Sequence, residues 1–237
     1  MKKFFVICSF IMMTLVLISC KESDEHTEFE FEWALGEHYS DTLVFADGYN
    51  IIKYTGSESV VTIPSEYKGK AVRYIDADVF KDNTTITKIV LPKTLLVFAA
   101  SSFEGTTNLT EISVNGEIGE RYVSRDGILY AKGYPEENGT LILGFIPLGR
   151  TKDIVIESDV THISGFIFDG VYGIENITIN VGSNLTSVSK LFTNFGLDIN
   201  YKLENIFVDE SQYDSLVELF SFRNADLVSL ISVKPQE

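Results

Sequence analysis

Few side chains in this sequence have the types and spacing that catalysis needs. The chain has two cysteines, Cys8 and Cys20, and three histidines, His26, His38 and His162. The sequence contains no H-E-x-x-H zinc motif, no G-x-S-x-G nucleophile turn and no phosphate-binding glycine loop. Because an enzyme needs a convergent set of reactive groups, we expect a non-enzymatic protein with no cofactor and no metal.

Carboxylates are the remaining candidates for chemistry. Asp76 and Asp78 are closely spaced, but such pairs are typical of solvated loops. A metal site at Asp82 or Asp169 is the strongest alternative. It would require further oxygen ligands brought together in space, which the sequence alone does not establish.

Cys20 stands at the end of an apolar run near the N-terminus. Two lysines precede this run, which extends from Phe4 to Ile18. Its length suits the core of a secretory signal and is shorter than the roughly 20 apolar residues of a membrane-spanning helix. The end of the run, Leu17-Ile18-Ser19-Cys20, resembles the lipobox of bacterial lipoproteins. This resemblance implies a signal peptide over 1–19 and a membrane anchor through lipid on Cys20; an ordinary signal peptide cut near a cysteine is the alternative.

The residues after Cys20 are charged. The stretch Lys21-Glu22-Ser23-Asp24-Glu25 resembles the short sequence that sends some Gram-negative lipoproteins to the outer face of the outer membrane. A plain charged linker over 20–28 is the alternative. We expect a protein of the cell envelope that is lipid-anchored in the outer membrane and exposed on the surface.

Composition narrows the classes of partner. With 34 acidic and 19 basic residues the formal net charge is −15, so phosphate backbones would be repelled and no nucleic acid partner is expected.

Neither cysteine is expected to form a disulfide within the chain. Cys8 would leave with the signal peptide, and Cys20 would carry lipid. An internal disulfide is therefore not expected, and stability must come from burial of a core.

A short apolar phrase recurs along the chain. Each copy reads apolar-x-x-Ile-x-apolar, and its end alternates with the period of two of a strand that has one buried side. The copies are Ile86–Leu91, Leu109–Val114, Ile174–Ile179 and Leu203–Val208. A second phrase precedes three of them and ends in Phe80, Phe103 or Phe168, always nine residues before the next central isoleucine. This fixed offset predicts that the three phenylalanines occupy one buried column.

The spacing of the repeat and its prolines resemble those of a known family. Ile89 and Ile112 are 23 residues apart, within the range of leucine-rich repeats. Together with Val61-Thr-Ile-Pro64 and Ile89-Val-Leu-Pro92, the chain over about residues 50 to 210 resembles the BspA-type leucine-rich repeat. The resemblance implies a mainly β solenoid of short strands, in which stacked units create the core. It also implies adhesion to host or matrix proteins or to glycans.

The repeat is interrupted by an insert over 116–150. Asp126-Gly127 between apolar stretches is a hairpin signal, and the segment resembles the β-hairpin elaboration common in the same family. The solenoid, 29–210, also needs covers at its ends. Alternating aromatic residues predict an N-terminal β cap over 29–58. Apolar residues at helical spacing, with Ser211 as the N-cap of the helix, predict a C-terminal helical cap over 211–237.

The strands of the solenoid would present their alternate residues outward on one sheet, which is the candidate binding face. Its residues are Glu111, Ser113, Asp153, Val155, Asn176, Thr178, Asn205 and Phe207. A solvated face with no ligand is the alternative. Phe207 is the candidate apolar anchor, unless it contacts the C-terminal helix. A structural or accessory lipoprotein of an envelope or nutrient-uptake complex is the competing function.

Two short motifs suggest modification. Asp41-Thr42 and Asp214-Ser215 each begin a three-residue sequence that resembles the O-glycosylation motif of some surface-exporting bacteria. The motif is too short to be specific.

Overall fold

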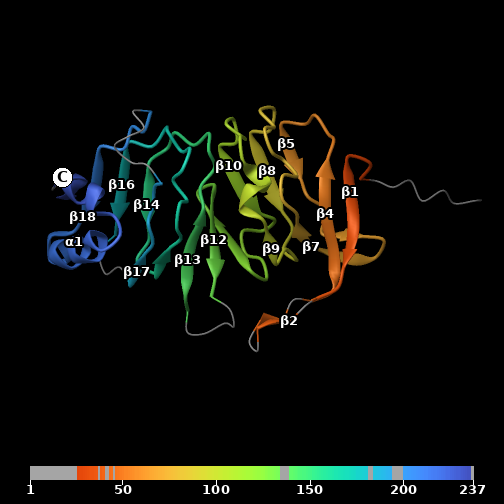
Figure 1. The fold of residues 1–237 in the computed structure, drawn as a ribbon, viewed down its shortest axis with the longest axis horizontal. Coiled ribbons are helices and arrows are strands. Elements are labelled where there is room, and N and C mark those ends of the chain that lie inside the picture. The colour runs from red at the N-terminus through yellow and green to blue at the C-terminus, as the bar shows by residue number, and fades with distance from the viewer. Residues whose placement is uncertain are drawn as a thin grey trace, which may run out of the picture.

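The structure, a computed structural model, describes most of the chain after residue 25. The described residues are 26–36, 38–40, 43–44, 46–133, 139–180, 184–193 and 200–235. Strands stack along the long axis of the molecule, from β1 at one end to β18 and α1 at the other (Figure 1). The predicted mainly β solenoid is confirmed.

The predicted repeat strands, together with β19 (Ile231–Val233), which was not predicted, form a series of parallel strands in two sheets, which we call the first ladder. All except β19 have the burial alternation that the sequence predicts. The central isoleucines Ile89, Ile112, Ile154, Ile177 and Ile206 are at most 2% exposed. The strands are β5 (Val60–Thr62), β8 (Lys88–Leu91), β10 (Glu111–Val114), β14 (Ile154–Ile156), β16 (Asn176–Ile179), β18 (Asn205–Val208) and β19. Stacking in register buries the apolar side that one short strand could not bury alone.

A second ladder, which the sequence analysis did not predict, lies on the other side of each unit. Its parallel strands are β4 (Gly48–Tyr54), β7 (Lys70–Ile75), β9 (Val97–Phe98), β13 (Leu141–Phe145), β15 (His162–Ile163) and β17 (Ser187–Val188). Four of them, β7, β9, β15 and β17, lead into the phrases that end in phenylalanine; β4 and β13 do not. Three of these strands have only two residues, which is too short for a period of two to be recognised.

The N-terminal end is covered by a β cap, as predicted. Strand β1 (Phe29–Ala34) pairs antiparallel with β4, and β4 continues in parallel with β7. Two short pairs complete this end: β2 (His38–Ser40) with β3 (Leu43–Val44), and β6 (Glu66–Tyr67) with β7.

The predicted inserted hairpin is also present. Strand β11 (Tyr122–Arg125) pairs antiparallel with β12 (Ile128–Lys132), which in turn pairs antiparallel with β13. The turn residues Asp126 and Gly127 both have positive φ, 49° and 74°, as a two-residue hairpin turn of the favoured hand requires. The insert does not project from the solenoid, because β13 joins the second ladder beside β15.

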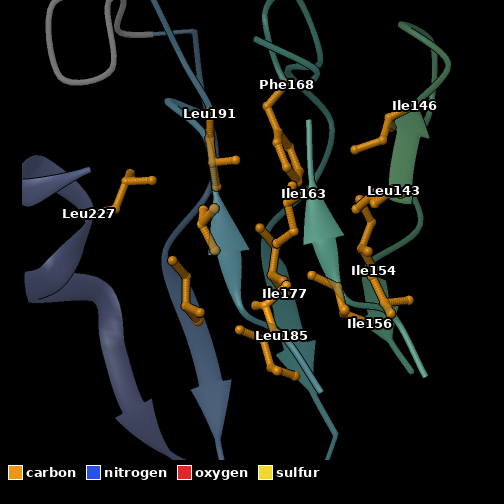
Figure 2. Packing of buried hydrophobic residues seen from close by; sticks show 14 of the residues in the cluster. Leu143, Ile146, Ile154, Ile156, Ile163, Phe168, Ile177, Leu185, Leu191 and Leu227 are labelled. Atoms are coloured by element: carbon orange, nitrogen blue, oxygen red, sulfur yellow. The ribbon is translucent and has the colours of Figure 1, made fainter. Parts of the chain in front are cut away.

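Strand β12 is buried on both faces and separates two hydrophobic clusters. Ile128, Leu129 and Tyr130 are 1%, 1% and 2% exposed. Ile128 and Tyr130 belong to the C-terminal cluster, whereas Leu129 belongs to the N-terminal cluster, because successive side chains of a strand point to opposite faces. Figure 2 shows part of the C-terminal cluster, with Ile154 and Ile177 of the first ladder and Leu143 of the second.

The phenylalanine column is buried as predicted but is divided between these clusters. Phe80, Phe103 and Phe168 are each 1% exposed. The rings of Phe80 and Phe103 are stacked, with centroids 5.5 Å apart and planes 4° apart. The Phe168 ring instead packs on Phe192, 5.3 Å away, in the C-terminal cluster.

The C-terminal end differs from the predicted helical cap in two details. Helix α1 (Tyr213–Ser221) buries Leu216 and Phe220 and is followed by strand β19. Helix α1 begins after Gln212, which has no side-chain capping hydrogen bond, so the predicted cap at Ser211 was wrong. Asp209 instead caps the 3-10 helix just before α1, where its carboxylate accepts a hydrogen bond from the Ser211 backbone N–H. Short 3-10 helices complete the structure: η1 (Ala100–Phe103), η2 (Glu210–Gln212) and η3 (Ala225–Leu230).

Candidate binding surface

The structure places the eight predicted binding residues on or beside the first ladder, but on two sheets. Glu111 and Ser113 lie on β10, in the sheet β10-β8-β5. The other six lie on, or directly before, strands of the sheet β14-β16-β18-β19. The prediction of one continuous sheet was therefore wrong.

The inserted hairpin causes this division. The carbonyl of Gly127, in the hairpin turn, accepts a hydrogen bond of 3.1 Å from the Ile112 backbone N–H. The edge of β10 that would otherwise face the next repeat strand is thus bonded to the hairpin turn. As a result, β10, which carries Glu111, does not pair with β14, the strand that follows Asp153, although the two strands belong to successive repeat units.

A row of polar side chains crosses the C-terminal sheet. The Asp153 carboxylate accepts hydrogen bonds from the backbone N–H of Asn176 at 2.8 Å and from its side-chain amide at 2.7 Å. The Asn205 amide then donates to the Asn176 side-chain oxygen at 2.9 Å. Because each member holds the next, this row presents oxygens and amides in a fixed orientation.

A more apolar row runs parallel to it. Thr178 is the register partner of both Val155 and Phe207, and Phe207 faces Ser232 on its other side. Val155 is 46% exposed, whereas Phe207 is half-buried. The neighbour of Phe207 across the sheet is strand β19, so the anchor proposed at this position is flanked by a strand that the sequence analysis missed.

On the N-terminal sheet the outward residues are charged or small. The Lys88 ammonium lies 2.5 Å from the Glu111 carboxylate, on paired positions of β8 and β10. Val60 of β5, 52% exposed, continues this row. Since Lys88 and Glu111 are both over a third exposed, their ion pair contributes little to stability.

A polar hollow of about 420 Å³ lies where the two sheets meet the hairpin turn. Its lining includes Glu111, Ser113, Glu117, Asp126, Arg150 and Lys152. Only the first two belong to the predicted face. Asp126 was recognised as a turn residue, but nothing in the repeat pattern marks Arg150 as the residue that would join the turn to the solenoid.

Arg150 is the central residue of this junction. It is 3% exposed, and its guanidinium donates to the backbone carbonyls of Asp126 at 2.6 Å, Lys152 at 2.8 Å and Asp153 at 3.2 Å. It also pairs with the Asp126 carboxylate at 2.7 Å. A planar fork of donors suits several acceptors at once, so Arg150 fixes the hairpin turn against the start of the C-terminal sheet.

The Asp126 carboxyl is held in its charged form. Partial burial is the largest influence and opposes ionisation, but hydrogen bonds from Lys152 and Arg150, together with their positive charges, outweigh it and lower the pKa of Asp126 below its ordinary value. The Lys152 ammonium lies 2.5 Å from this carboxylate and is exposed. The hollow therefore combines several carboxylates with the exposed ammonium group of Lys152, which can match a polar or charged partner.

Several other predicted sites are placed or left out by the structure. Cys20 and Asp41-Thr42 lie outside the described residues. Asp214 and Ser215 are exposed on the first turn of α1.

Among the described residues, no three His, Cys, Asp or Glu side chains cluster as a metal site would require. The Asp169 carboxylate accepts a hydrogen bond of 2.7 Å from the Thr193 backbone N–H. No helix in the described ranges has the length and apolar character to cross a membrane.

Comparison with known proteins gives a family match over most of the chain. The description "BspA type Leucine rich repeat region" matches residues 43–123 and 145–230, in six copies. The gap between the two ranges falls within the insert and includes strand β12. Among curated proteins, none matches the sequence.

Solved structures with similarity to the chain come from several bacteria. A leucine-rich-repeat protein of T. pallidum is 14% identical, with a TM-score of 0.41, and the match covers 76% of this chain and 68% of that one. A leucine-rich cell surface protein of Faecalibacterium prausnitzii is 13% identical, with a TM-score of 0.30 and coverage of 78% and 88%. A leucine-rich-repeat protein of Bacteroides ovatus is 16% identical, with a TM-score of 0.34 and coverage of 76% and 54%.

Proposed function

The chain belongs to the BspA-type leucine-rich-repeat family, and from this premise we propose that it is a lipid-anchored surface protein that binds a host or matrix protein through the outward side of the first ladder. Proteins of this family are generally surface proteins that interact with other proteins. Glycans remain the second class of ligand. The observation that supports the site most directly is the polar hollow at Arg150, with rows of outward residues on the sheets beside it.

The surface has the composition of a protein interface. Exposed Val155 and half-buried Phe207 supply apolar area, while the Asp153–Asn176–Asn205 row supplies oriented hydrogen-bonding groups. Interfaces combine apolar anchors with a polar surround in this way. The partner would bridge the two sheets across the hollow.

A binding screen with two variants tests this proposal. The protein is assayed against a panel of matrix proteins and a glycan array, beside Glu111→Lys and Phe207→Ala. Glu111→Lys reverses a charge at the edge of the hollow, and Phe207→Ala removes the largest apolar side chain of the face. Each is expected to weaken binding at least tenfold, about 1.4 kcal/mol.

Glu66→Lys is the matched control for the charge reversal. Glu66 is exposed on β6, in a different sheet, so its replacement should leave binding unchanged. Binding that survives both test variants would exclude the outward side of the first ladder as the contact surface and leave the insert at 116–150, which also lines the hollow. No ligand in either panel would support the accessory lipoprotein of an envelope or nutrient-uptake complex instead.

The membrane anchor is tested separately at Cys20. We expect Cys20→Ala to move the protein from the membrane fraction to the soluble fraction and to abolish metabolic labelling with a fatty acid. Lipid chains on the protein would account for firm membrane attachment, since each acyl chain adds to membrane affinity. Cys8→Ala, inside the expected signal peptide, is the control and should retain both membrane association and label. Unchanged labelling of Cys20→Ala would contradict the anchor.

A further inference from the structure

Neighbouring units are joined by their turns as well as by their strands. Each turn follows a strand of the second ladder and ends at the phenylalanine of its phrase. The Phe80 backbone N–H donates to the Ser102 carbonyl at 2.9 Å, and the Phe166 N–H donates to the Lys190 carbonyl at 2.7 Å. Successive turns thus form a third stack along the solenoid.

This stack lacks one turn at the middle of the molecule. The insert contributes β13 to the second ladder, but β13 continues into Ile146-Pro147-Leu148 without a turn of the repeat type. In the described part of the chain, no backbone hydrogen bond joins the turn at 99–104 to the turn at 164–169. The Phe145 ring lies between them, 5.1 Å from the Phe103 ring.

A groove of about 510 Å³ occupies the place of the missing turn. Its apolar lining consists chiefly of Phe98, Phe103, Phe145, Ile146, Leu148 and Phe166. Phe103 and Ile146 form its fully buried part, while Phe98, Phe145 and Leu148 are half-buried at its wall. This apolar surface suits a hydrocarbon side chain and offers little to a hydroxyl-rich ligand.

Phe166 is an unusual residue at the edge of this groove. It is 55% exposed, and its φ of 59° places it in the left-handed region, where a bulky residue is an outlier. Phe166 is the third residue after strand β15, and the third residue after strand β7 is Asp78, which also has a positive φ, 63°. Aspartate adopts this backbone conformation more readily than phenylalanine does. A small polar residue would avoid both the backbone strain and the exposed ring, so a strained aromatic here points to use of its side chain.

Acidic groups flank the groove. Glu104 and Asp169 contribute to its lining. The Lys81 ammonium lies 3.1 Å from the Glu104 carboxylate and 3.6 Å from the Asp78 carboxylate. On the far side of the 164–169 turn, the Lys190 ammonium donates to the Thr193 carbonyl at 3.3 Å. Carboxylates outnumber ammonium groups around the groove, in a chain whose net charge is −15, which favours a cationic ligand.

We propose that this groove is a second docking site, for a polypeptide segment that presents one large apolar side chain beside Lys or Arg. The apolar side chain would occupy the place that the missing turn leaves, between Phe145 and Phe166, and the basic residue would face Glu104 and Asp169. This site lies on the turn side of the solenoid and does not depend on the face proposed for the first ladder.

Short synthetic peptides test the site by nuclear magnetic resonance. The probe is Ac-Gly-Lys-Phe-Lys-Gly-NH2, titrated into the ¹⁵N-labelled protein. We expect it to shift the backbone amide resonances of Gly144 and Gly165, which line the groove. Replacing the probe's Phe with Ser, or both of its Lys with Glu, should weaken the shifts at least tenfold.

Two variants of the protein complete the test. Phe166→Ser should lower the affinity for the Phe probe at least fivefold. Glu104→Lys should also lower this affinity, because it places a positive charge beside the lysines of the probe. Phe222→Ser is the matched control, because Phe222 is 83% exposed on the C-terminal end, and Glu111→Lys should also leave the probe unaffected. Equal shifts with the Phe and Ser probes, or unchanged affinity in Phe166→Ser, would overturn the proposal.

Discussion

Replacing Phe103 by alanine is expected to lower the free energy of unfolding by about 3 to 5 kcal/mol. The side chain is 1% exposed and packs on Phe80, Phe98 and Phe145, with ring centroids 5.1 to 5.5 Å apart. Its removal would leave a cavity that the flanking units cannot close, because their backbones are held in register by the ladders. Urea denaturation followed by circular dichroism measures the loss.

Phe222→Ala is the control for this substitution. The same ring is deleted, but from a position that is 83% exposed, so the expected change is within about 0.5 kcal/mol. If Phe103→Ala has an unfolding midpoint as high as that of Phe222→Ala, then Phe103 does not hold the stack together.

Replacing Arg150 by methionine is expected to cost about 2 to 4 kcal/mol, even though methionine is close in size. Three backbone carbonyls, of Asp126, Lys152 and Asp153, would lose a hydrogen bond at a site where Arg150 is 3% exposed. The Asp126 carboxylate would lose its buried partner as well. Equilibrium unfolding gives the cost, and faster amide hydrogen exchange at Ile112 would localise it to the hairpin junction.

Lys152→Met separates the buried contacts from the charge. Lys152 also pairs with Asp126, but its side chain is 70% exposed, so its loss should cost less than about 1 kcal/mol. Equal losses in the two variants would mean that Arg150 acts only through the charge of Asp126 and that its bonds to the carbonyls are unimportant.

The repeat and its buried positions could be predicted from the sequence because they depend on local periodicity. The central isoleucines of the first ladder, Phe80, Phe103 and Phe168 all lie where the spacing put them. The Asp126-Gly127 turn was recognised for a similar reason, since a two-residue hairpin needs positive φ at both positions.

The features that the sequence analysis missed depend on contacts between distant segments. The binding face is divided because Gly127 bonds to Ile112, and the register between an insert and the repeat has no local signal. Strand β19 was missed because its pairing with β18 crosses a helix. The cap at Ser211 was assigned wrongly because a 3-10 helix capped by Asp209 comes first, and α1 starts only after Gln212.

Strand β12 gives the molecule a natural point of division. Leu129 closes the core on one side of it, and Ile128 and Tyr130 close the core on the other. In a stacked repeat each unit touches only its neighbours, so units added or lost beyond this strand would leave the opposite core intact. The two halves of the protein can therefore change length independently of each other, with the hairpin as a fixed boundary between them.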